Sequence, residues 1–364
     1  MSPTRARGAR AARAVSGKEP AGRFKIAVLG DIHGNVAALD AALTAIEKAK
    51  PDAIAVLGDL VMNGPRPTEV VARIRTLDAA GAYVIQGNTD IAVADLDFGA
   101  AFPWLDVVPG HQIAAAEWAH EQLSPADLDY LRKLPAERRI RVGDQLVLAC
   151  HGSPGSQTDG LPADLDPSVT IQRITRTDAR VIVCGHTHVA EWREFGRRLV
   201  CNPGSCGYAF DGDAGAAWAL LTIELPAPEP TETPGDAGAT AEADAPAEAD
   251  APAEADAPAE ADAPAETDAM VGARPEVGVA ATEHTEDADA YADAYDADAG
   301  ADAYADADAD ADVVTAPQPA GPAITVELRR AAYDPLPVAD EVSARGLPGD
   351  VYRAATIRTG RYVR

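Results

Sequence analysis

The stretch FKIAVLGDIHGN, residues 24–35, decides how this chain folds. Its first six residues are almost continuously apolar, which is typical of a strand buried on both faces of a sheet. Two glycines then flank a short segment that holds Asp31 and His33, and both of these side chains can bind a metal ion. Because the two residues are two positions apart, an extended strand end would point them the same way. The stretch predicts a strand that delivers two metal ligands to one edge of a sheet.

Four further islands repeat this pairing of a glycine with a metal-binding side chain. They are Gly58-Asp59, Gly87-Asn88-Thr89-Asp90, His151-Gly152 and Gly185-His186-Thr187-His188. Four of the five islands follow an apolar run, and segments with helical spacing, such as 36–49 and 68–80, lie between the runs. This alternation of buried strands and helices indicates an α/β sandwich. We therefore expect the five islands to converge where the strands end.

The remaining elements fit the same architecture. Helices are predicted over Gly110–Leu123, after the N-cap Ser124, and over Ser168–Arg176. Two hairpins are predicted around Gly143 and Gly196, and strands over Val181–Cys184 and Ala216–Leu225. Strand character returns at Ala323–Tyr333, which we expect to pair with Ala216–Leu225. Short helices are expected near Gly346-Leu347-Pro348.

The acidity of the chain is concentrated in one tract. The formal net charge is −27, and residues 226–321 contain 26 acidic residues and one basic residue, which leaves 32 acidic and 30 basic residues elsewhere. The tract repeats Ala-Asp-Ala-Pro-Ala-Glu, a composition that cannot bury enough apolar surface to fold. The domain organisation follows: a disordered basic arm (1–22), a folded α/β domain (23–225), a disordered acidic insert (226–322), the last strand of the domain (323–337) and a helical tail (338–364).

Several classes of protein are excluded by composition. The part of the chain that is predicted to fold is nearly neutral and has no basic stripe for nucleic acid. No apolar run approaches the length of a membrane span, and the first 22 residues lack the apolar segment of a secretory signal. The four cysteines form no CxxC pair, so free thiols in a reducing compartment are expected. These features predict a cytoplasmic protein that does not bind membranes.

The candidate ligands form a mixed set of oxygen and nitrogen donors. They are Asp31, His33, Asp59, Asn88, His151, His186 and His188. Carboxylate, amide and imidazole together suit Mn²⁺, Fe, Zn²⁺ or Ni²⁺ better than Ca²⁺. Seven ligands exceed the need of one tetrahedral ion, and they suit two divalent ions about 3.5–4 Å apart, as in two-metal hydrolases.

In this order the five motifs resemble the calcineurin-like metallophosphoesterase superfamily, and more closely its bacterial phosphodiesterase-like branch. The resemblance covers about residues 24–225, resumes near 323–334, and implies a four-layer α-β-β-α sandwich. It implies that Asp31, His33 and His188 bind the first metal ion. It further implies that Asn88, His151 and His186 bind the second ion, with Asp59 as the bridge.

The activity implied is hydrolysis of a small phosphoester, with a phosphodiester or a nucleotide favoured, by a water that two metal ions activate. We assign catalysis to Asp59, Asn88 and His151, with the aspartates as metal ligands rather than nucleophiles. The alternative is a non-catalytic scaffold or protein-binding module on the same fold. Relatives with that role generally lose metal ligands. Formation of a homo-oligomer is left open.

Two departures from the family pattern bear on the substrate. Many members carry a histidine after Gly-Asn that assists the leaving group, where this chain has Thr89. A threonine cannot act as a general acid near neutral pH, which favours substrates with good leaving groups. The run from Gly58 to Gly64 also lacks the Asp-Arg pair of protein Ser/Thr phosphatases.

The islands contain three more candidates. Asn35, Thr89 and Asp90 are expected to orient the ligands or to contact the substrate, although Asn35 and Asp90 are equally consistent with plain turn residues. Trp104, Phe102 and Arg66 are candidates for the rim of the substrate site. The turn Asn202-Pro203-Gly204-Ser205, which also matches the branch, is expected to support that rim.

Overall fold

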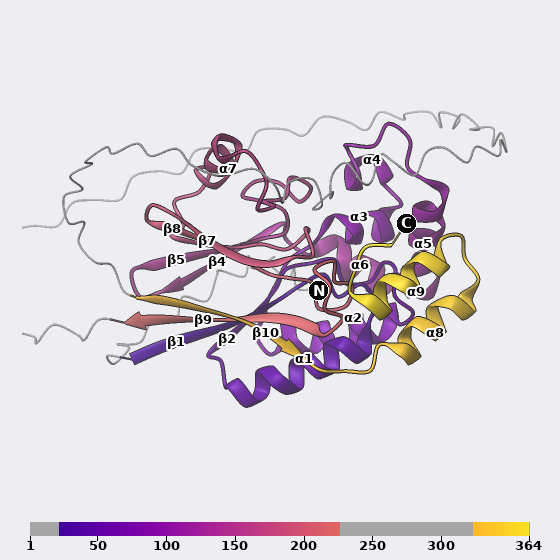
Figure 1. Ribbon diagram of the computed structural model, residues 1–364, viewed down its shortest axis with the longest axis horizontal. Coiled ribbons are helices and arrows are strands. Elements are labelled where there is room, and N and C mark those ends of the chain that lie inside the picture. Colours follow the sequence, from indigo (N-terminus) through magenta and orange to yellow (C-terminus); the bar gives the residue numbers. More distant parts are fainter. Residues whose placement is uncertain (1–21, 226–322, 364) are drawn as a thin grey trace, which may run out of the picture. The chain divides into compact units, whose positions relative to one another are not determined.

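The computed structural model describes residues 22–225 and 323–363 of the 364-residue chain. Two five-stranded mixed sheets, named A and B below, lie between layers of helices (Figure 1). This arrangement confirms the predicted α/β (α+β) sandwich of four layers. The predictions of disorder concern residues 1–22 and 226–322, and apart from Gly22 these lie outside the described residues.

Sheet A holds the stretch that opened the sequence analysis. Its strand order is β10-β9-β1-β2-β3. The strands are β1 (Gly22–Leu29), β2 (Ala53–Val56), β3 (Tyr83–Val84), β9 (Ala216–Leu225) and β10 (Ile324–Ala331). β1, β2 and β3 are parallel, and β9 runs antiparallel to both β1 and β10. The pairing of β9 with β10 confirms the predicted hairpin between segments about 100 residues apart.

Sheet B has the order β4-β5-β6-β8-β7. Its strands are β4 (Glu137–Val142), β5 (Gln145–Cys150), β6 (Val181–Val183), β7 (Ala190–Phe195) and β8 (Arg198–Pro203). β5, β6 and β8 are parallel, while β4 and β7 pair antiparallel at the two edges. Both hairpins predicted from the glycine turns are therefore present.

The apolar run of β1 is continuous because the strand is covered on both faces. Ala27 and Leu29 belong to the core shared with α1 (Val36–Ala49) and α2 (Pro67–Ala79). Ile26 and Val28 belong to the core that sheets A and B share. On the far side of sheet B, a third core lies under α7 (Pro167–Ile174). A strand in this position has no polar face, which explains the absence of alternation in its sequence.

Four helices connect β3 to β4. They are α3 (Asn88–Asp95), α4 (Phe98–Ala101), α5 (Gly110–Gln122) and α6 (Pro125–Lys133). Ser124 caps α6 as predicted, in a reciprocal capping box with Asp127. The prediction that Asn88 stands at a strand end is wrong, because β3 ends at Val84 and Asn88 is the first residue of α3. The Asp90 carboxylate accepts a hydrogen bond from the Gly87 N–H, and this bond starts the helix.

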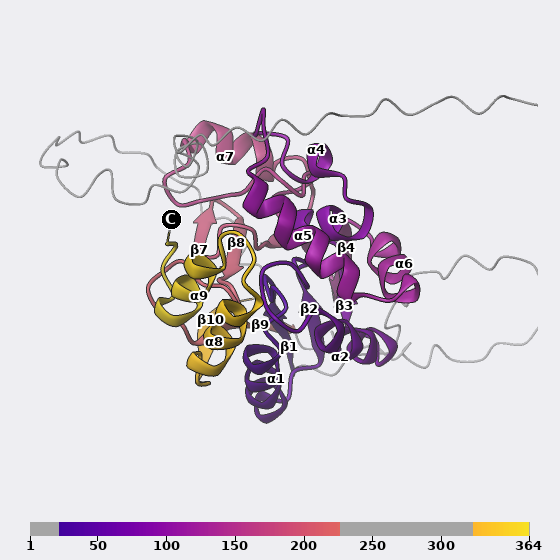
Figure 2. The same ribbon diagram turned by 90° about the vertical axis from the view of Figure 1, so that its right-hand side faces the viewer.

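The C-terminal segment forms a helical hairpin of α8 (Leu336–Arg345) and α9 (Asp350–Thr359). Asp350 forms buried ion pairs with Arg345 and Arg353 at 2.8 and 3.1 Å, while the pair between Arg358 and Asp340 is exposed. Figure 2 looks onto the end of the sheets where this hairpin lies, with α3 and α5 on the other side. None of the helices within residues 22–225 and 323–363 has the length and apolar character needed to cross a bilayer.

Candidate metal centre

The five glycine islands meet at one end of the two sheets. Asp31 and Asp59 follow β1 and β2 of sheet A, whereas His151 and the pair His186 and His188 follow β5 and β6 of sheet B. The loops are tied across the sheets, since the His186 N–H lies 3.3 and 3.2 Å from the two carboxylate oxygens of Asp31, which accept from it. All seven predicted ligands are buried, with at most 8% of any residue exposed. The structure therefore brings together residues that lie up to 157 positions apart in the sequence.

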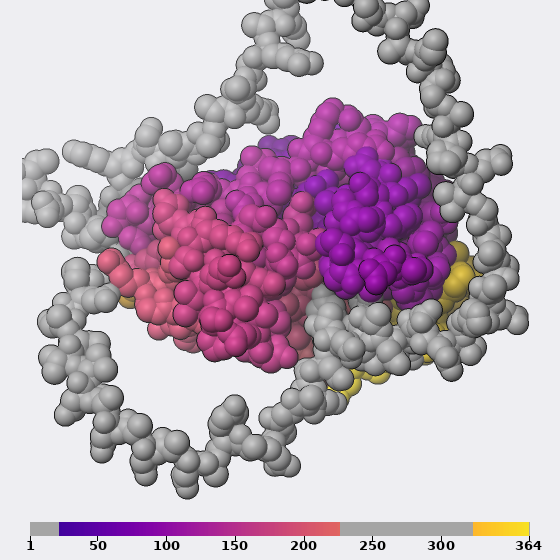
Figure 3. Space-filling model, turned by 90° about the horizontal axis from the view of Figure 1, so that it is seen from above, coloured from indigo at the N-terminus to yellow at the C-terminus, as the bar shows by residue number. Residues whose placement is uncertain are grey.

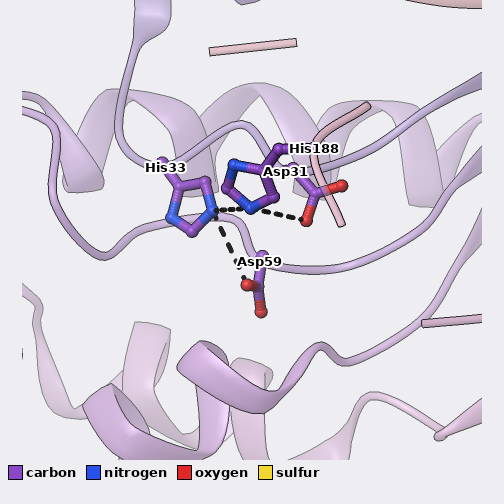
Figure 4. A group of neighbouring side chains, drawn as sticks. All are labelled: Asp31, His33, Asp59 and His188. Atoms are coloured by element: carbon purple, nitrogen blue, oxygen red, sulfur yellow. Dashed lines mark hydrogen bonds and ion pairs between the residues drawn. The ribbon is translucent and has the colours of Figure 1, made fainter. Parts of the chain in front are cut away.

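Four of the seven form a tight cluster, called here the first ligand group: Asp31, His33, Asp59 and His188. Their ligand atoms all lie within 4.8 Å of one another. The Nε2 atoms of His33 and His188 are 3.1 Å apart, and His188 Nε2 lies 3.4 Å from Asp31 Oδ1. Figure 4 shows the four side chains pointing toward a common centre. An ion at that centre would be surrounded by two imidazole nitrogens and two carboxylates.

The other three residues form the second ligand group: Asn88, His151 and His186. Asn88 Oδ1 lies 3.0 Å from His151 Nε2 and 3.1 Å from His186 Nδ1. The Asn88 amide nitrogen donates to the Ala101 carbonyl, which identifies the atom that faces the histidines as the oxygen. This group therefore also presents oxygen and nitrogen donors to one point.

Asp59 lies between the two groups. Its Oδ2 is 3.6 Å from His33 Nε2 in the first group, and its Oδ1 is 3.4 Å from His151 Nε2 in the second. Oδ1 also accepts a hydrogen bond from the Thr89 N–H at 2.9 Å. One carboxylate thus faces both groups, with a different oxygen toward each.

In three of the four imidazoles a backbone carbonyl contacts Nδ1. Nδ1 of His33 lies 3.1 Å from the Met62 carbonyl, and Nδ1 of His188 lies 2.5 Å from the Tyr208 carbonyl. His151 Nδ1 makes the same contact with the Leu57 carbonyl at 2.7 Å. A carbonyl only accepts, so each Nδ1 carries the proton and each Nε2 turns toward the centre.

Because Nδ1 carries the proton in His33 and His188, the contact between their Nε2 atoms indicates what kind of ligand the centre can bind. Burial lowers the pKa of both rings, so they are neutral, and their Nε2 lone pairs face each other at 3.1 Å. Two acceptors at that distance repel unless a cation lies between them. The residues therefore fit a divalent metal ion, and the mixed donor set agrees with that fit.

Two further groups hold protons that a metal ion would displace. Burial raises the pKa of the Asp31 carboxyl to about 8. For His151, burial would lower the pKa, but the Asp59 carboxylate outweighs it and raises the pKa to about 9. Burial would also raise the pKa of Asp59, yet His151 and His33 hold it well below its usual range. Ligands must lose their protons to bind metal, so metal binding at this centre would release protons from Asp31 and His151.

The backbone of the ligand loops is not extended, contrary to the expectation for Asp31 with His33, and the same holds for His186 and His188. All four residues have left-handed backbone, with φ of 51°, 50°, 71° and 60°. Asp59 joins them with φ of 53°. Non-glycine residues hold this conformation only where surrounding contacts impose it, and such residues cluster at functional sites. The strand-end argument placed these side chains at the correct edge of the sheet for the wrong local reason.

The three supporting candidates differ in what they touch. Asp90 accepts hydrogen bonds from the backbone N–H groups of Asp59 and Leu60, and so fixes the loop that carries Asp59. Asn35 caps α1 through the Ala38 N–H, and its amide donates to the Gly207 carbonyl and to the Tyr333 hydroxyl. The buried Thr89 Oγ1 has no hydrogen-bond partner among the described residues. Asp90 and Asn35 therefore hold loops in place rather than reach the pocket.

The turn after β8 holds two of the ligand loops. The Asn202 amide donates to the Gly185 carbonyl and to Thr187 Oγ1, and the Ser205 hydroxyl donates to the Asp31 carbonyl. This turn thus supports the metal centre itself. Of the three rim candidates, Trp104 does line a cavity beside His186, whereas Phe102 is buried behind it. Arg66 instead forms exposed ion pairs with Glu69 and Glu341.

Sequence reasoning missed the residues that close the pocket around the ligands. They are Asn63, Gln112, Tyr208, Phe210 and Tyr362. The Phe210 ring stacks on His188, with ring centroids 4.2 Å apart, and Tyr362 packs edge-on against Phe210 at 5.1 Å. Arg353 of the C-terminal hairpin donates to Asn63 Oδ1, which lies in the loop beside His33. These residues sit in no motif, so only the folded chain identifies them.

Comparison with known proteins supports the site. Residues 24–225, more than half of the chain, match the calcineurin-like phosphoesterase superfamily domain. An uncharacterized protein of Methanocaldococcus jannaschii is 26% identical over 211 residues, which are 54% of this chain and 82% of that protein.

Solved structures align over a similar part of the chain. A hypothetical protein of Pyrococcus horikoshii is 26% identical, with a TM-score of 0.48, over 57% of this chain and 89% of that one. A metallophosphoesterase of Sphaerobacter thermophilus is 27% identical, with a TM-score of 0.42, over 56% of this chain and 84% of that one.

Proposed function

The chain belongs to the calcineurin-like phosphoesterase superfamily, and we propose that it is a hydrolase that uses two divalent metal ions to cleave a phosphodiester or a nucleotide. The observation that carries this proposal is the position of Asp59. Its two oxygens face His33 in one ligand group and His151 in the other, at 3.6 and 3.4 Å. A carboxylate placed in this way suits a bridge between two ions.

Each ligand group has its own task in this proposal. Asp31, His33 and His188 would hold one ion, and Asn88, His151 and His186 the other. When bound, the two ions supply an activated water and neutralise charge on the phosphoryl oxygens. The backbone carbonyls on His33, His151 and His188 keep the Nε2 lone pairs directed at the ions without reorganisation. We propose Mn²⁺ as the ion, because the donors are mostly oxygen and imidazole.

Thr89 bears on the choice of substrate. It is buried at the pocket beside Asp59, where a residue with a titratable proton could have reached the leaving group. Its hydroxyl does not donate a proton near neutral pH. We therefore propose a substrate whose leaving group departs without a strong acid, and a phosphodiester rather than an alkyl phosphomonoester. The buried free cysteines suit a cytoplasmic setting, and we propose a small phosphoester rather than a nucleic acid or a membrane as the partner.

The test measures hydrolysis of bis-p-nitrophenyl phosphate with Mn²⁺ added to the full chain. We expect turnover that depends on metal and that falls at least about 10³-fold in Asp59→Asn, since this change weakens both ligand groups together. Asp178→Asn, an exposed aspartate paired with Arg139, is the matched control and should retain full activity. Full activity in Asp59→Asn would refute the site.

A non-catalytic scaffold on the same fold is the competing function. It predicts metal binding without turnover, whichever of Mn²⁺, Ni²⁺, Co²⁺ or Zn²⁺ is supplied. The structure gives no reason to prefer it, because all seven ligands are present and buried around one centre. Bound metal with no hydrolysis of the diester would favour the scaffold.

A further inference from the structure

A cavity of about 460 Å³ lies beside the metal centre and shares His186 with the pocket that holds the ligands. Its walls come from two segments that both contact His186, the loop after α4 and the segment from Thr158 to Arg173. In Figure 3 these two segments, in purple and in pink, meet on the same face. A volume in this range suits a small organic group and far exceeds what a methyl ester needs.

The first wall presents the flat side chain of Trp104. Its loop is fixed at the metal centre, because Ala101 at the end of α4 accepts the hydrogen bond from the Asn88 amide. Phe102 is buried behind Trp104, and the two rings meet edge to face at 5.8 Å. The Trp104 ring also contacts His186, with centroids 5.9 Å apart. Trp104 is thus half-buried and held beside a metal ligand.

The second wall combines polar groups with Pro162 and Leu165. Arg173 of α7 donates to the Gly160 carbonyl, and its second terminal nitrogen lies 3.3 Å from Asp159 Oδ1. These contacts fix the guanidinium, which is only 19% exposed, at the cavity surface. His186 hydrogen-bonds the backbone of Thr158, so this wall is tied to the metal centre as well. The Arg173 guanidinium, the Asp159 carboxylate and the Thr158 hydroxyl together offer hydrogen-bond donors and acceptors to the edge of a polar ring.

From these walls we propose that the cavity binds the base of a nucleoside esterified to the scissile phosphate. The base lies along Trp104, and its polar edge faces Arg173 and Asp159, while the phosphate sits over the ligand groups. This assignment rests on the proposed phosphodiesterase function and names its substrate class. Stacking on an aromatic side chain tolerates any base, so the site selects nucleosides over alkyl groups without choosing one base.

The test compares two diesters that share p-nitrophenolate as leaving group. One is thymidine 5′-(p-nitrophenyl phosphate), and the other is methyl p-nitrophenyl phosphate. We expect the full chain with Mn²⁺ to favour the thymidine ester by roughly tenfold or more in kcat/KM, the scale of one stacked base. Trp104→Ala should remove this preference through KM and leave hydrolysis of the methyl ester within about threefold.

Further measurements test whether the preference depends on Trp104 and on the nucleoside. Trp192→Ala, at an exposed tryptophan on β7, is the matched control and should keep the preference. Thymidine 5′-monophosphate should inhibit wild type more strongly than inorganic phosphate does, and Trp104→Ala should equalise the two. Arg173→Gln should weaken inhibition by thymidine 5′-monophosphate and leave inhibition by inorganic phosphate unchanged.

The outcomes separate the two proposals. If both esters are hydrolysed equally well by wild type, or if Trp104→Ala keeps the preference, the nucleoside site is wrong while the phosphodiesterase stands. If neither ester is hydrolysed, the proposed function itself fails.

Discussion

The two ligand groups of the metal centre are built in different ways. In the first group all four residues, Asp31, His33, Asp59 and His188, have left-handed backbone. Their loops are locked to each other, because the N–H groups of Asp31 and His33 donate to the carbonyls of Gly58 and Asp59 at 3.0 and 2.9 Å. In the second group only His186 has positive φ, whereas Asn88 starts a helix and His151 directly follows strand β5.

The supports of the two groups differ accordingly. The first group rests on bonds between the loops of sheet A and on the turn that holds Ser205. The second group rests on the cavity walls, through the Asn88 contact with Ala101 and the His186 contact with Thr158. Left-handed residues cost about 1–2 kcal/mol each, so the first group persists only because its surroundings over-determine it. We therefore expect the first group to be the more rigid and to bind its ion more tightly.

Removing one histidine from each group gives the largest expected effect. We expect His188→Ala and His186→Ala each to lower turnover of bis-p-nitrophenyl phosphate by roughly 10²–10³-fold, because each removes a metal ligand. Metal content measured by mass spectrometry should separate them. His186→Ala should retain close to one ion per chain, whereas His188→Ala should retain less. Equal metal loss in both would contradict the difference in rigidity.

The effect of pH on stability and on metal binding is expected to be the next largest. Without metal, Asp31 and His151 keep protons up to about pH 8 and about pH 9, above the usual ranges of these groups. At these two residues the folded chain binds more protons than the unfolded chain, so their contribution to stability falls as pH rises through these values. Metal affinity should rise over the same range, and the difference in Tm between metal-loaded and metal-free protein should widen by roughly 5 °C from pH 6.0 to 8.5.

Calorimetric titration in buffers with different ionisation enthalpies counts the protons released per chain when both ions bind. We expect between one and two at pH 7, because both groups must ionise or deprotonate to act as ligands. Release of no protons, together with a constant difference in Tm, would show that the two ligands are already deprotonated.

A smaller effect is expected from Gly64→Ala, which disturbs the packing of the loop that carries His33 in the first ligand group. A Cβ at Gly64 would lie 2.0 Å from the His33 carbonyl oxygen, so the loop must shift. We expect a loss of roughly 1–3 kcal/mol in unfolding free energy, and weaker binding of the first ion. Gly110→Ala is the control, because its Cβ would meet no atom within 4 Å and, like Gly64, it does not have a positive φ. Unchanged metal affinity in Gly64→Ala would argue against a rigid first group.

The smallest effect is expected from Thr89→Val. The valine keeps the backbone N–H that donates to Asp59 and removes only the hydroxyl. If this hydroxyl takes no part in protonating the leaving group, turnover should stay within about threefold. A steeper loss with poorer leaving groups, measured over a series of aryl diesters, would give Thr89 a catalytic task.

The sequence predicted the fold well where local signals were strong. The bounds of α1 were predicted to the residue, and both glycine-turn hairpins were found where expected. The prediction of a strand end at Asn88 failed. The Asp90 carboxylate accepts the hydrogen bond that starts α3 and also holds the loop of Asp59, and this second contact depends on the fold. Sequence reasoning also failed on the backbone of Asp31 and His186, since no propensity assigns left-handed conformation to these residues when neighbouring loops impose it.

The sequence by itself determined which side chains form the candidate metal centre and in which order they arrive, since each lies in one of five glycine-containing motifs and most of these motifs follow a buried run. Only the tertiary structure decided how those side chains are held and what surrounds them. The carbonyl of Tyr208 selects the tautomer of His188, and Arg353 reaches Asn63 across 290 residues. Contacts of that span leave no periodicity or motif, because they depend on where two distant segments pack and not on either segment alone.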